Sequence, residues 1–331
     1  MRSKSKRSNS SIITMIIAVV GLVLLAFNYQ YLIDQVVVSQ VYKPSQEVSQ
    51  IADQIQFTPK GKFLFLAAQP ELNSRSTFNK HCEKKEEQTV VLGCYIGPQH
   101  MYVYNVTDPR LSGVRQVTAA HEMLHGAYDR LSYSEKKNVN KMIEDALPSV
   151  QQADSDLAVR LKIYDKTEPG ERNNELHSIL GTEAANLPAE LEDYYKQYFI
   201  NRSIITTFAS QYDKVFNDVK DQQDQLVAQL DALAAEINSL TDQYNVDTTK
   251  LNDDIENFNS RANTEGEFES QSEFNAARAE LLAKRDALNA KKDLINTKIS
   301  QYESMRAKLN DLNIQVKELN SKVDSTSVPS L

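Results

Sequence analysis

The sequence contains no tryptophan, and its 331 residues include only 9 glycines and 9 prolines. Because turn-forming residues are this scarce, the sequence excludes a large all-β fold and favours long helices. A hydrophobic content of 41% and a charged content of 25% exclude both a disordered chain and a polytopic membrane protein. The net charge is −8 although residues 1–10 carry four basic residues and no acid. Residues 11–331 are therefore strongly acidic, which argues against nucleic acid as a partner.

Charged residues are absent between Arg7 and Asp34, and this stretch is densely apolar from Ile12 to Phe27. A bilayer core needs about 20 apolar residues, a length that the run reaches if Asn28–Ile33 is counted. We therefore expect a cytoplasmic basic tail over 1–10 and a transmembrane helix over 11–33. The protein would then be a single-pass protein of the cell membrane, with its bulk on the extracytoplasmic side. A cleaved signal peptide is the alternative, although the end of the run lacks a typical cleavage site.

The chain has only two cysteines, Cys82 and Cys94. In an oxidising compartment we expect them to form a disulfide. Two unpaired buried thiols are the main alternative, and half of a zinc site is a weaker one because neither cysteine belongs to a C-x-x-C motif.

Residues 34–205 read as a mixed domain. Pro44 to Ile55 indicates a short helix with Ser45 as its cap. The apolar run 62–68 reads as a buried strand, and 89–96 and 101–106 are two more β-rich runs that a turn at Gly97-Pro98 could join into a hairpin. A helix should follow from about 114 to 131. The expected fold class is therefore α+β.

Residues 206–325 predict a long helical hairpin, with a disordered tail over 326–331. Apolar residues recur every 3.5 positions, as in a coiled-coil seam, with a stutter after Tyr244 and a break over 264–273. Facing positions of an antiparallel pair should have residue numbers with a constant sum, and many apolar pairs such as Phe216 with Leu319 sum to 535. Pairing with another chain, and hence self-association through the coiled coil, is the alternative.

Residues 121–125 read His-Glu-Met-Leu-His. On a helix, the side chains of residues i and i+4 lie on one face, so His121 and His125 can bind one metal ion. Glu122 lies beside them and can act on a metal-bound water. Zinc suits two imidazole nitrogens and a carboxylate, with one position left open. The alternative is that these are surface histidines of an ordinary helix.

These residues resemble the HExxH motif of zincin metallopeptidases, and in particular of the gluzincins, whose third ligand is a glutamate on a later helix. Asn174-Glu175-Leu176-His177-Ser178 is similar to the pattern around that glutamate. The resemblance implies a zincin-like domain with one Zn²⁺ held by His121, His125 and Glu175. Glu183 is the alternate third ligand and His177 a third candidate. The sequence departs from some gluzincins at Ile179, where an acid often supports a histidine ligand.

The resemblance implies zinc-assisted hydrolysis of peptide bonds in a peptide or protein substrate, with Glu122 transferring the proton from water to the leaving amine. A further donor for the oxyanion is expected, and the candidates are Tyr194, Tyr195, Tyr198 and His177. The rival interpretation is a non-catalytic structural coiled-coil protein with a relic zinc site. A coiled-coil sensor that uses the metal as a switch is a third.

Overall fold

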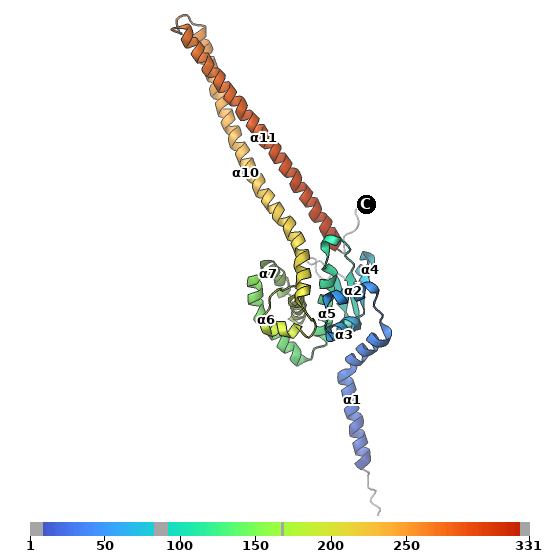
Figure 1. Ribbon diagram of the computed structural model, residues 1–331. Helices are drawn as coiled ribbons and strands as arrows, with labels where there is room; N and C mark the ends of the chain where they lie inside the picture. The colour runs from blue at the N-terminus through green and yellow to red at the C-terminus, as the bar shows by residue number, and fades with distance from the viewer. Residues whose placement is uncertain (1–8, 83–91, 167–168, 325–331) are drawn as a thin grey trace, which may run out of the picture. The chain divides into compact units, whose positions relative to one another are not determined.

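The computed structural model describes residues 9–82, 92–166 and 169–324 (Figure 1). The chain divides into two compact units, one formed by Met1–Val215 with Asn320–Leu331 and the other by Phe216–Leu319. The expected tail over 326–331, most of the expected tail over 1–10 and the start of the expected strand over 89–96 lie outside the described residues.

The first unit is built mainly from helices. Its α-helices are α1 (Asn9–Val36), α2 (Gln46–Ile55), α3 (Pro59–Ala67), α4 (Arg75–His81), α5 (Val114–Asp129), α6 (Tyr133–Ala153), α7 (Ser155–Leu161), α8 (Pro169–Thr182) and α9 (Ala189–Tyr195). Shorter helical segments are η1 (Val37–Val41), η2 (Gly97–Gln99), η3 (Pro109–Leu111) and η4 (Lys162–Lys166). As expected, Ser45 caps α2, because its hydroxyl accepts from the backbone N–H of Val48.

A small sheet contains the three strands of the described residues: β1 (Pro70–Asn73), β2 (Gly93–Ile96) and β3 (His100–Tyr104). Their order is β1-β3-β2, with β1 parallel and β2 antiparallel to the central strand β3. The expected hairpin between the second and third β-rich runs is confirmed, with η2 as its turn. Strand β2 therefore lies at one edge of the sheet, and within the described ranges one of its sides has no partner strand.

The expected α+β class is wrong, since the unit is predominantly helical with a minor sheet. The predicted strand over 62–68 falls largely within helix α3. Pro59 occupies the first turn of α3, and the hydroxyl of Thr58 accepts from the N–H of Gly61, so two helix-start signals precede the apolar run. A short apolar run does not by itself distinguish a buried strand from a buried helix.

The predicted transmembrane helix is also wrong. Residues 11–33 lie within α1, but no helix among the described residues is both long and apolar enough to cross a membrane. The C-terminal part of α1 contacts the protein instead: the ring of Tyr31 lies 5.7 Å from that of Phe63, and Asp34, directly after the expected span, is buried against Arg130. The remaining run, Ile12–Phe27, is shorter than the roughly 20 residues that a bilayer core requires. The membrane location derived from this span is withdrawn with it.

The second unit is a hairpin of two long helices, formed by parts of α10 (Ser203–Ala262) and α11 (Gln271–Val323) (Figure 1). Ion pairs join the two helices: Lys298 with Glu236, Lys291 with Asp247, and Lys284 with Asp254. Along these pairs the residue number rises in α10 and falls in α11, so the two helices are antiparallel, which agrees with the sequence prediction. The residue numbers of these pairs sum to between 534 and 538, close to the expected 535.

The predicted stutter after Tyr244 is absent from this hairpin. The partly covered residues of α10 include Asp247, Leu251, Asp254 and Phe258 at the regular spacing, together with Thr248, whereas Ile255, which the stutter would place in the seam, is 38% exposed. Asp247 and Asp254 therefore lie at the margin of the seam, with side chains 44% and 45% exposed, where lysines of α11 pair with them. The prediction placed polar Thr248 in the seam but no charged residue, and it therefore missed the spacing through Asp247 and Asp254.

Helix α5 lies at the centre of the first unit, because it packs against α2, α3, α8 and strand β2. Most of its residues are buried, and Ala120, Met123 and Leu124 are fully inaccessible. A helix that is covered on most sides holds its side chains in fixed directions. The histidine motif is therefore carried by the most firmly packed helix of the unit.

Candidate metal centre

The two histidines of the motif lie one turn apart on α5, and their side chains converge. The Nε2 atoms of His121 and His125 are 3.0 Å apart, and the two rings meet nearly edge to face. Their side chains are 18% and 12% exposed, respectively. Both nitrogens therefore face one point at the rim of the protein core, which solvent can still reach.

Glu175 brings a carboxylate to the same point from α8. Its Oε2 lies 3.6 Å from Nε2 of His121, and its Oε1 lies 3.6 Å from Nε2 of His125. In a tetrahedral zinc site with ligand distances of about 2.0–2.1 Å, ligand atoms are separated by about 3.3 Å. The separations of 3.0 and 3.6 Å bracket this value. Among the described residues, this is the only group of three histidine, cysteine or acidic side chains that converge closely enough to hold a metal ion.

The approach of α8 to α5 depends on a glycine. A Cβ atom on Gly181 would lie 2.4 Å from a methyl carbon of Leu124 and 2.8 Å from the ring of Tyr195. Any larger residue would therefore force the two helices apart. Because Glu175 lies less than two turns before Gly181 on α8, this close contact sets the distance of its carboxylate from the histidines.

A second residue of α8, Asn174, orients one of the histidines. The Nδ1 atom of His125 lies 3.0 Å from Oδ1 of Asn174. Since an amide oxygen only accepts hydrogen bonds, Nδ1 of His125 is the donor, which leaves the lone pair of its Nε2 directed at Glu175 and His121. Asn174 belongs to the sequence motif around Glu175, but the motif predicts no role for it. Its position next to Glu175 on one helix was the available signal.

Glu122 is buried beneath strand β2. It is 6% exposed, and a Cβ on Gly93 would lie 2.5 Å from its carboxylate oxygen, so the strand passes directly over it only because residue 93 is glycine. Burial raises the pKa of Glu122 to about 7. The nearby His125 lowers this pKa, Glu175 raises it, and a hydrogen bond from the backbone N–H of Tyr95 lowers it. The carboxyl group can therefore exchange a proton near neutral pH.

The alternate third ligands lie elsewhere. The carboxylate of Glu183 forms an ion pair with Arg160 at 2.6 Å. His177 is fully buried, and its Nε2 lies 2.9 Å from the hydroxyl of Tyr194. Burial, followed by the neighbouring charges of His125 and His121, lowers the pKa of His177 to about 3, so this imidazole is neutral at physiological pH. Neither residue belongs to the converging group.

The tyrosines considered as oxyanion donors are engaged in the core. The hydroxyls of Tyr194 and Tyr198 are 3.2 Å apart, and the hydroxyl of Tyr195 donates to the backbone carbonyl of His177 at 2.6 Å. Tyr195 and Tyr198 are at most 1% exposed. These hydroxyls therefore stabilise the packing of α9 on α8.

The structure joins Cys82 and Cys94 in a disulfide, with their Cα atoms 5.8 Å apart. Cys82 ends α4 and Cys94 lies in β2. The bond therefore anchors the strand that covers Glu122.

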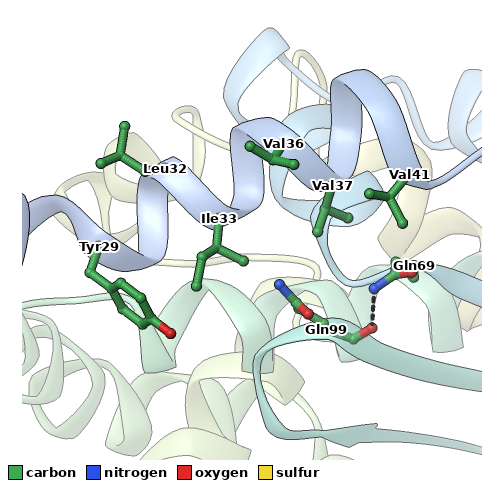
Figure 2. A pocket seen from close by; sticks show the side chains of 8 residues that line it. All are labelled: Tyr29, Leu32, Ile33, Val36, Val37, Val41, Gln69 and Gln99. Carbon is green, nitrogen blue, oxygen red and sulfur yellow. Dashed lines mark hydrogen bonds between the residues drawn. The ribbon is translucent and has the colours of Figure 1, made fainter.

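A separate apolar groove of about 440 Å³ lies where α1 continues into η1. Figure 2 shows Val37 and Val41 in its lining, next to a hydrogen bond from Nε2 of Gln69 to the backbone carbonyl of Gln99. None of the converging metal-site residues lines this groove.

Comparisons of the chain with protein-family models, with curated proteins and with solved structures found no match.

Proposed function

We propose that the protein is a zinc-dependent endopeptidase of the gluzincin type, with His121, His125 and Glu175 as the zinc ligands. The observation that carries the proposal is the convergence of these three side chains at separations that suit a tetrahedral site. Two neutral imidazoles and one carboxylate are a donor set typical of catalytic zinc, and the partial exposure of all three side chains leaves room for a fourth position.

A zinc ion in such a site polarises a carbonyl group and makes bound water acidic. The chain supplies the remaining parts. Glu122 accepts a proton from the attacking water and returns it to the leaving amine, a role that suits a carboxyl group with a pKa near neutrality. Asn174 keeps His125 in the tautomer that a metal ligand requires.

The outer edge of β2, which has no partner strand among the described residues, is the proposed binding site for an extended peptide. Because the N–H of Tyr104 donates to the carbonyl of Leu92, the alternation of an antiparallel pair directs the backbone groups of Gly93 and Tyr95 away from β3. The hydrogen bond from the N–H of Tyr95 to Glu122 fits this direction. A substrate strand added at this edge would lie next to Glu122 and would compete with this carboxylate for the N–H of Tyr95.

The rival proposal is a structural protein with a non-catalytic zinc site. The deep burial of Glu122 favours it, because a working base needs access to water. The two proposals agree on zinc binding and differ on hydrolysis.

The full chain should therefore be assayed for zinc content and for cleavage of a fluorogenic peptide library. Glu122→Gln should retain one zinc per chain and lose cleavage by at least about 100-fold. Glu175→Gln should lose zinc, whereas the matched control Glu171→Gln, on the exposed first turn of the same helix, should keep both zinc and activity. Zinc binding without cleavage by the wild-type chain would establish the structural role instead.

A further inference from the structure

Arg130, directly after α5, makes hydrogen bonds with all five of its N–H groups. Its Nε and one Nη2 hydrogen reach the carboxylate of Asp34 at 2.7 and 3.0 Å, and its Nη1 reaches the hydroxyl of Tyr95 at 2.8 Å. The other two bonds go to the backbone carbonyls of Gly126 and Pro98. The guanidinium thus joins the end of α1, the end of α5, strand β2 and the turn η2 that follows this strand.

The ion pair in this network is buried: the side chain of Asp34 is 2% exposed and that of Arg130 is 13% exposed. The amide of Gln30 also donates to Asp34 at 2.8 Å. If one partner of such a pair is removed, the other charge is left in the interior without compensation. Arg130 therefore depends on Asp34, a residue of the N-terminal helix, to keep its place.

Tyr95 connects this network to Glu122. Its backbone N–H donates to the carboxylate of Glu122, its hydroxyl accepts from Arg130, and its ring lies so close to Gly126 that a Cβ there would be 3.1 Å away. The strand residue is thus held at its backbone by the proposed base and at its side chain by the arginine. The position of β2 over α5 follows from these contacts.

We propose that Asp34, Arg130 and Tyr95 are positioning residues that hold the edge strand β2 in register over Glu122. The proposal rests on the proposed peptidase function, in which β2 aligns the substrate with the base. Loss of the network lets β2 shift relative to α5. Because the alignment of reacting groups is sensitive to shifts of about 1 Å, turnover then falls while zinc binding is retained.

The first test is amide hydrogen exchange over Gly93–Ile96 in the metal-free full chain. Tyr95→Phe removes only the hydroxyl, and Asp34→Asn removes the charge. Each should accelerate exchange in this strand on the order of tenfold. The matched control is Tyr42→Phe, which likewise removes a single tyrosine hydroxyl, in this case one that donates to the backbone carbonyl of Pro70 in β1, and leaves β2 untouched. Unchanged protection in both network variants would overturn the proposal.

The second test is steady-state kinetics with a peptide that the wild-type chain cleaves. Both network variants should lower kcat on the order of tenfold, leave KM within about twofold and keep one zinc per chain. Faster exchange with an unaltered kcat would mean that the network is only structural, and would overturn the positioning role. If the wild-type chain cleaves nothing, the proposed function fails, and the exchange experiment alone then decides whether the network holds β2.

Discussion

Substitution of Glu122 by glutamine tests whether β2 covers this carboxyl group in the folded protein. Burial raises the pKa of Glu122 from 4.5 to about 7, so the folded protein binds the proton more tightly than the unfolded chain does. Between these two pKa values the folded state holds more protons, and stability therefore falls as the pH rises. The contribution is fully present below pH 4.5 and is lost as the pH passes through about 7. Glutamine does not titrate, so Glu122→Gln does not show this loss.

The size of the effect follows from the two pKa values. At 1.36 kcal/mol for each pH unit, a rise from 4.5 to about 7 corresponds to about 3 kcal/mol. The difference in the free energy of unfolding between the metal-free Glu122→Gln variant and the metal-free wild type should therefore grow by about 3 kcal/mol, in favour of the variant, as the pH rises from 4 to 8. His177 acts in the opposite direction, because its pKa is lowered and its stability contribution is lost as the pH falls below 6.5. Both proteins share His177, so it cancels in the difference.

The measurement should report on the first unit alone, because the chain has two units and its bulk unfolding need not be two-state. Hydrogen exchange of the slowest amides of α5 gives the free energy of opening of this unit. At each pH both proteins share the same intrinsic exchange rates, so the ratio of their rates gives the stability difference directly. If the free energies of opening of the two proteins change in parallel from pH 4 to pH 8, Glu122 is as well solvated in the folded protein as in the unfolded chain. The argument from burial would then fail.

Two further predictions concern packing in the two units. Gly181→Ala places a methyl group 2.4 Å from Leu124, so it should lower the free energy of unfolding by about 1–3 kcal/mol. It should also weaken zinc binding, which competition with a chelator measures. The control Gly170→Ala has open space around the added methyl group and should have neither effect. In the hairpin, the ion pair of Lys291 with Asp247 is partly exposed, so Lys291→Leu should have little effect on stability and lower the melting temperature only slightly, whereas the double variant with Asp247→Leu should recover or exceed the wild-type value because two apolar side chains then meet beside the seam. A double variant less stable than the single one would contradict this view of the seam.

Features determined by local spacing could be predicted from the sequence. The helix that carries His121 and His125 was expected over about 114–131 and spans Val114–Asp129. The seam residues expected in α11 are all at least partly covered. In both cases the spacing of side chains along one helix determines which of them share a face.

Features that depend on contacts between distant residues could not be predicted. Asp34 and Arg130 are 96 positions apart, and nothing in either residue's neighbourhood in the sequence indicates the other. The apolar residues before Asp34 were instead interpreted as part of a membrane span, because hydropathy does not reveal that their helix ends against the protein. The same limit explains the missed role of Gly93, whose importance is visible only once β2 lies over Glu122.

The proposed zinc site combines both kinds of feature. His121 and His125 keep their mutual distance as long as α5 is helical, so half of the site is fixed by local structure. The position of Glu175 depends on the packing of α8 against α5, which the contact between Gly181 and Leu124 sets. The affinity for metal is therefore linked to the integrity of the core between these helices, and a metal bound at this point would in turn hold α8 against α5. In the proposed site, the residues that bury α5 would therefore also bring Glu175 to the two histidines.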